Sequence, residues 1–225
     1  MTLTKTKAQS EKTTLSIGRL DFYHLFWAFL WSAFLGVVIE TVFMFLTRGA
    51  LMNRSSVLFG PFSLVWGIGA VLFTMLLGWL QPYGCTALFL GGAVVGTVFE
   101  YFCSWLQEVL FGLRFWSYYH LPLNLNGRVC LMFSFFWGAA ALFWMRLLWP
   151  VLCFWLDRPR RPTRRMTRVL VVFMILNIAV TAAALARMDA RIRGAPPGNV
   201  VETFLDLNFP DERLLRYFTN VKYIG

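Results

Sequence analysis

Two glutamates stand inside long apolar stretches of this chain, where a charged side chain is costly. Glu40 lies in GVVIETVF and Glu100 lies in GTVFEYF, so each carboxylate has a glycine four residues before it. A charge at the centre of a membrane helix costs about 2.5–3.5 kcal/mol on insertion scales, so it requires a partner or a function. In such surroundings a carboxylate can bind a cation or take up a proton.

Arg54 and Arg128 are the candidate partners of these glutamates. Each arginine stands where the apolar run after its glutamate begins, on the same expected side of the membrane. One interpretation is a structural ion pair in each half of the chain, Glu40–Arg54 and Glu100–Arg128. The other is a polar, outward-facing cavity whose two carboxylates bind a solute. The sequence leaves both interpretations open.

One face of the stretch around Glu100 stays polar. Glu100, Ser104 and Glu108 follow one another at four-residue spacing, which places them on one face of a helix. Asparagines typical of turns flank the apolar runs on the same side. The candidate substrate- or ion-binding residues are Glu40, Glu100, Arg54, Arg128, Asn53, Asn124, Asn126, Ser104 and Glu108.

The sequence contains no pattern typical of catalysis. We find no nucleophile–base pair, no cluster of metal-ligating residues and no GxxxxGK[ST] phosphate-binding loop. We therefore expect no catalytic residue, no metal and no cofactor. The chain by itself is expected to be neither an ATPase nor another enzyme.

The composition indicates that the bilayer is the solvent. Of the 225 residues, 58% are hydrophobic and only 14% are charged, whereas soluble proteins carry about 25% charged residues. A membrane-spanning helix needs about 20 apolar residues. The sequence predicts an all-α membrane protein with five transmembrane helices. The apolar runs are 22–47, 57–80, 85–111, 129–148 (which can extend to 156) and 168–186.

The first four runs contain a repeat. Residues about 26–80 and 85–148 form two halves, each with small residues four and eight positions before its glutamate. The next run carries SLVWG in the first half and SFFWG in the second. The pattern predicts a tandem parallel repeat of two helical hairpins, related by an axis along the membrane normal. Small residues at four-residue spacing favour close helix packing in lipid.

Basic residues predict the orientation. The net charge is +10, and the basic residues are concentrated in the segment before residue 22 and in the segment 157–168. The positive-inside rule therefore places 1–21 in the cytoplasm as a basic N-terminal segment. The five-helix domain is 22–186, and 187–225 is an extracytoplasmic amphipathic tail that packs onto the outer face or the membrane surface. We expect the basic residues to contact lipid headgroups and no nucleic acid.

Four stretches together resemble a known family. GxxxE, NRSSVLFGPFSLVWGIG, WSYYHLPLNLNGRVCLMFSFFWG and the tail FLDLNFPDERLLRYFTNVKY are similar to the bacterial CmpB-like family of ABC-transporter type IV permeases, from about Phe26 to Tyr223. The chain differs where Trp66-Gly67 replaces the family's usual Tyr-Gly. The residues on family-motif positions are Glu40, Asn53, Arg54, Gly60, Pro61, Glu100, Asn124, Asn126, Gly127, Arg128 and Trp137.

The resemblance implies a multi-pass protein of the bacterial inner membrane and a separate ATPase subunit as partner. The expected cytoplasmic loops are short or rich in proline and arginine, which leaves little apolar surface for an ATPase to dock. Our leading hypothesis is a transporter or permease component for a small polar or cationic solute. The alternatives are a membrane partner or sensor protein that acts through its tail and, less favoured, an intramembrane enzyme. A homodimer is compatible with the small number of spans.

Overall fold

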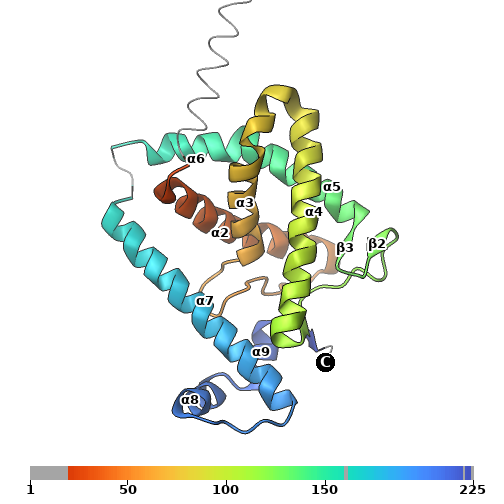
Figure 1. Cartoon of the computed structure of the whole chain (residues 1–225), viewed down its shortest axis with the longest axis vertical. Coiled ribbons are helices and arrows are strands. Elements are labelled where there is room, and N and C mark those ends of the chain that lie inside the picture. Colours follow the sequence, from red (N-terminus) through yellow and green to blue (C-terminus); the bar gives the residue numbers. More distant parts are fainter. Residues whose placement is uncertain (1–19, 160–161, 220, 224–225) are drawn as a thin grey trace, which may run out of the picture.

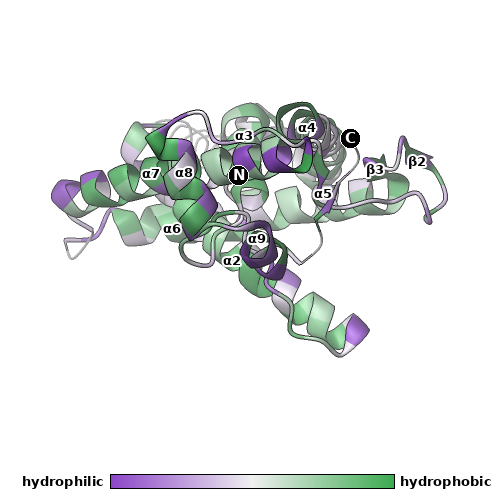
Figure 2. Ribbon diagram, turned by 90° about the horizontal axis from the view of Figure 1, so that it is seen from below, coloured by the Kyte–Doolittle hydropathy of each residue, from purple (hydrophilic) through white to green (hydrophobic). Residues whose placement is uncertain are grey.

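A computed structural model describes residues 20–159, 162–219 and 221–223, and in these residues the chain is mostly helical. Within the described residues, four helical stretches are long and apolar enough to cross a membrane: Phe22–Arg48, Leu64–Phe111, Leu131–Leu156 and Arg164–Ile192. Figure 2 shows apolar residues along most of the length of these helices, with hydrophilic residues gathered at ends and loops. The prediction of an all-α membrane protein is therefore confirmed.

The first hairpin is formed by α2 and α3. Helix α2 (Phe22–Arg48) begins at Asp21, whose carboxylate caps the backbone N–H of His24, and ends at Gly49 with a left-handed φ of 67°. Helix α3 (Leu64–Leu77) follows and packs mainly on α2. The expected run 57–80 therefore becomes helical only at residue 64, because Gly60 adopts a φ of 83° and Pro61 follows it.

The second hairpin is formed by α4 and α5. The six-residue turn η1 (Gly78–Tyr83) reverses the chain, so α3 and α4 (Gly84–Phe111) lie side by side and antiparallel (Figure 1). Helix α5 (Leu131–Phe143) packs extensively on α4 and continues through the π-helical turn η2 (Trp144–Leu148) into α6 (Trp149–Leu156). The expected fourth run thus extends to residue 156.

Five separate spans and a tandem repeat remain predictions. The stretch Leu64–Phe111 contains both α3 and α4. The 14 residues of α3 rise only about 21 Å, less than the roughly 30 Å of the bilayer core. Of the basic N-terminal segment predicted for residues 1–21, residues 1–19 lie outside the described part of the chain.

Two irregular segments lie beside the helices. The first, residues 50–63, is held by α7 (Arg164–Ile192): the Asn177 side chain accepts from Phe59 N–H (3.1 Å) and donates to Phe59 C=O (2.6 Å). The second contains β1 (Leu113–Arg114) and the hairpin of β2 (Asn124–Leu125) with β3 (Val129–Cys130). Irregular backbone in a membrane protein requires such partners for its polar groups.

The tail folds back onto the end of α7. Helix α7 is longer at both ends than the expected 168–186, so residues 187–192 of the predicted tail belong to a helix. Helices α8 (Val200–Asn208) and α9 (Asp211–Tyr217) follow, and β4 (Lys222–Tyr223) pairs antiparallel with β1. A small apolar core joins the tail, the end of α7 and Leu113.

Candidate functional site

Glu100 is buried in α4 and receives only neutral donors. Only 5% of the surface of this residue is exposed. Oε1 accepts from the Tyr118 hydroxyl at 2.8 Å, and Oε2 accepts from Trp137 Nε1 at 3.0 Å. Among the described residues, no arginine, lysine or histidine forms an ion pair with this carboxylate. A buried carboxylate without a cation is costly unless a bound ligand or proton compensates it.

Glu40 in α2 has the partner that the sequence predicted. Its Oε2 accepts from Arg54 Nε at 2.7 Å, and its Oε1 accepts from Trp66 Nε1 at 2.6 Å. Both side chains of the ion pair are partly exposed. The predicted Glu40–Arg54 pair is confirmed, so one of the two glutamates is neutralised within its own hairpin.

The predicted Glu100–Arg128 pair is wrong. Arg128 donates instead to Glu108 at 2.7 Å and to the Ser104 hydroxyl at 3.4 Å. Arg114 binds the same Glu108 oxygen at 2.8 Å, and this hydrogen bond raises the pKa of Arg114. The reason lies in the path of the loop after α4, which brings both arginines to Glu108, two turns beyond Glu100, and places Tyr118 on Glu100 itself.

The three asparagines among the candidates bind other groups. Asn53 donates to the carbonyl of Tyr217 in the tail at 3.2 Å and caps a local turn. Asn124 accepts from Gly127 N–H within the β2–β3 hairpin. Asn126, with a φ of 54° in the turn of that hairpin, donates to the Tyr101 hydroxyl at 3.0 Å. These hydrogen bonds hold loops, and the structure does not bring the asparagines to either intramembrane carboxylate.

Sequence reasoning did not assign a role to the neutral donors that contact the carboxylates. Trp66 in α3 and Trp137 in α5 each donate to the glutamate of their own hairpin, and their rings contact each other with centroids 5.9 Å apart. Tyr118 comes from the loop after α4. The signal for the two tryptophans was present in the sequence, since SLVWG and SFFWG place a tryptophan at the same position of each half.

Glycines explain why the indoles lie so close to the carboxylates. A Cβ at Gly36 would stand 2.2 Å from Trp66 Cγ, and one at Gly96 would stand 2.5 Å from Trp137 Cβ and Cγ. Only glycine, which has no Cβ, leaves room for each tryptophan to pack against the helical turn that precedes its glutamate. In each GxxxE pattern, the glycine therefore leaves room for an indole ring, and the glutamate one turn later accepts the hydrogen bond from that indole.

A buried carboxylate held only by neutral donors has the chemistry to take up a proton or a cation. The two tryptophans meet it and its counterpart through their indole N–H groups, and their ring centroids lie 5.9 Å apart. Within the described residues, no group of three or more His, Cys, Asp and Glu side chains could hold a metal ion.

The fold and the site define a polytopic α-helical membrane protein with an unpaired intramembrane carboxylate. The sequence matches the family described as "Putative ABC-transporter type IV" over residues 27–182, and the chain belongs to this family. The resemblance inferred from the motifs is thereby confirmed. No curated protein and no solved structure matched the chain.

Proposed function

We propose that this protein is a membrane transporter, or the membrane component of one, that binds a small cationic solute at Glu100. The observation that carries the proposal is the difference between the two intramembrane glutamates. Glu40 is paired with Arg54 at 2.7 Å, whereas Glu100 receives only a hydroxyl and an indole N–H. An intramembrane ionisable residue is a functional-site hypothesis by default, and the one without a protein counter-ion is the one left to take up a cation or a proton.

The charges around Glu100 support a small solute with one positive charge. Glu108 is already shared by Arg114 and Arg128, so the outer rim of the site carries an excess of positive charge. A multiply charged cation would be repelled at this rim, and a bulky one would find no space between the tryptophan rings. The solute therefore replaces the Tyr118 hydroxyl or the Trp137 N–H at the carboxylate.

We also propose that the two hairpins are a tandem parallel repeat with five spans in total. Contacts at equivalent positions support this proposal. In each half, one glycine leaves room for the tryptophan that donates to the glutamate. A second glycine in each half packs against a phenylalanine carbonyl of the preceding helix. The equivalent pairs are Gly36 and Gly96, Glu40 and Glu100, Trp66 and Trp137, Gly67 and Gly138, and Phe29 and Phe89.

The family membership supports a bacterial inner-membrane location and a separate ATPase subunit as the energy source. The distribution of basic residues supports an N-terminus in the cytoplasm and a C-terminus outside. In this proposal the chain moves a solute and carries out no chemical reaction. A homodimer would bring two such sites together.

The proposal is tested by ligand-dependent stability of the purified protein. Thermal unfolding is followed for the wild type, Glu100→Gln and Glu40→Gln with a panel of alkali-metal, alkaline-earth and organic ammonium cations. A ligand at 100 times its Kd stabilises the folded state by about 2.7 kcal/mol. We expect a monovalent cation to raise the Tm of the wild type, and this rise to vanish in Glu100→Gln and to persist, reduced, in Glu40→Gln.

Glu212→Gln is the matched control, because it removes one carboxylate from an exposed position in the tail. It should respond to cations as the wild type does. If no cation stabilises the wild type, or if Glu100→Gln responds like the wild type, Glu100 is a structural residue. The search for function would then move to the tail.

A further inference from the structure

Helix α8 carries apolar side chains on its outward side as well as on the side that packs against the protein. Asp206 points toward the protein and accepts from Arg187 at 2.9 Å, while Glu202 caps the start of α8 by accepting from Gly198 N–H at 2.7 Å. Leu205, on the same side as Asp206, is buried. A surface helix in water normally has its charged residues outward and its apolar stripe toward the core.

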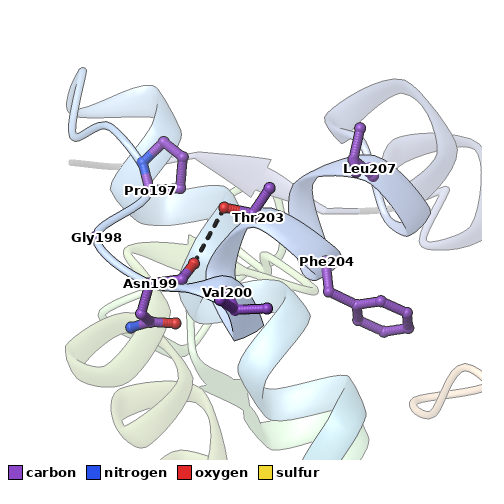
Figure 3. Close-up of a pocket in the computed structure, with 7 residues that line it drawn as sticks. All are labelled: Pro197, Gly198, Asn199, Val200, Thr203, Phe204 and Leu207. Atoms are coloured by element: carbon purple, nitrogen blue, oxygen red, sulfur yellow. Dashed lines mark hydrogen bonds between the residues drawn. The ribbon is translucent and has the colours of Figure 1, made fainter.

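The outward face of α8 is apolar. Val200, Phe204 and Leu207 follow at i, i+4 and i+7, which places them within one narrow stripe. They are 85%, 57% and 77% exposed. Figure 3 shows Val200 and Phe204 projecting from one side of the helix, beside an open hollow that Pro197 and Gly198 also line.

The stripe lies beside the end of α7 at which arginines follow the apolar residues. The apolar run of α7 ends at residue 186, and Arg187 and Arg191 follow on the next turns. Both arginines bind α8 through Asp206, so α8 is held beside this end. Figure 1 shows α8 beside the lower end of α7. An apolar span that crosses a bilayer ends where headgroups and acyl chains meet.

Further contacts fix the direction in which the stripe points. Arg191 also binds Asp211 at the start of α9 and the carbonyl of Phe209 between the two helices. The pairing of β4 with β1 ties the end of the tail to the loop after α4. The tail is thus a folded unit that presents one apolar stripe outward.

We propose that α8 is an interfacial membrane anchor, whose Val200–Phe204–Leu207 stripe inserts among the lipid chains next to the end of α7. An amphipathic helix in the interface buries its apolar face about 5–10 Å into the headgroup boundary. The stripe is too small for a stable protein interface. One face of a nine-residue helix, about 13.5 Å long and about 11 Å wide, offers roughly 150 Å², whereas a standard interface buries about 800 Å² per partner.

The depth of the stripe can be measured by spin-label accessibility in the full chain. Phe204→Cys is labelled with a nitroxide in a background with Cys85→Ser and Cys103→Ala, which leaves only the buried Cys130 and Cys153. The protein is placed in nanodiscs of phosphatidylcholine and phosphatidylglycerol. Collisions with oxygen, which concentrates in lipid, are compared with collisions with a water-soluble nickel chelate.

We expect the oxygen-to-nickel ratio at residue 204 to exceed clearly the ratio at a label on Glu212→Cys, an exposed polar position in α9. Leu207→Cys should repeat the result if the first variant folds poorly. A nickel accessibility at both stripe positions equal to that at Glu212 would place the stripe in water and overturn the proposal. Exclusion of both reagents would mean that protein covers the stripe, either a second copy or another partner, and would overturn it equally.

Discussion

The substitution Gly96→Ala tests the packing that holds the Trp137 indole on Glu100. A Cβ at residue 96 would lie 2.5 Å from Trp137 Cβ and Cγ, whereas ordinary contacts begin at 3.4 Å. The tryptophan must therefore retreat from α4 by about 0.9 Å. Its hydrogen bond to Glu100, now 3.0 Å long, would lengthen beyond the 3.5 Å limit.

The expected cost has two parts. Overpacking of a tight core costs about 1–3 kcal/mol, and a lost hydrogen bond to a charged group costs about 1.5–3 kcal/mol. Alanine recovers up to about 1 kcal/mol because it is the better helix former. The net loss in the free energy of unfolding is therefore expected at about 1.5–5 kcal/mol.

The assay is equilibrium unfolding of the purified protein in mixed micelles with increasing sodium dodecyl sulfate. Gly78→Ala is the matched control, because Gly78 has a helical φ of −54° and a Cβ there would meet nothing within 4 Å. It should leave the stability unchanged or slightly higher. If Gly96→Ala is as stable as Gly78→Ala, the packing of Trp137 does not depend on the glycine and the description of the site is wrong.

Two further predictions concern the elements around the site. Asn177→Leu removes both hydrogen bonds to Phe59 and leaves the backbone N–H and C=O of Phe59 unpaired. Each unpaired group should lower the free energy of unfolding by about 1–3 kcal/mol. Thermal unfolding measures this loss, and an unchanged Tm would contradict it. Hydrogen bonds from Arg187 lower the pKa of Asp206 from its ordinary 3.8. Their stabilisation is complete above pH 3.8 and is lost as the pH falls through the lower folded value. Hydrogen exchange in α8, corrected for intrinsic rates, should therefore accelerate in acid, and a constant protection would contradict a stabilising role for the Arg187–Asp206 pair.

Local patterns were sufficient to predict the class of protein and part of the site. Run length and composition gave the membrane helices, because a bilayer imposes a simple length rule. The Glu40–Arg54 pair was predictable since a short segment of 13 residues separates the two. The GxxxE pattern correctly indicated close packing, and the packed partner in each half is the tryptophan of the following helix.

Longer connections limited the rest of the prediction. Between Glu100 and Arg128 lie 27 residues, the end of α4 and the loop after it, and the path of that loop decides that Tyr118, and not the arginine, reaches the carboxylate. The start of α3 depends on a positive φ at Gly60 that hydropathy does not encode. The outward apolar stripe of α8 could be recognised only from the structure, where Arg187 binds Asp206 and so fixes which side of the helix faces the protein.

The central claim, that Glu100 is the carboxylate that binds the solute, is tested most directly by infrared difference spectroscopy. The spectrum of the protein is recorded with and without the cation that stabilises it, for the wild type, Glu40→Gln and Glu100→Gln. We expect a change in a carboxyl band in the wild type and in Glu40→Gln that is absent from Glu100→Gln. The same band change in Glu100→Gln, or its loss in Glu40→Gln alone, would contradict the account.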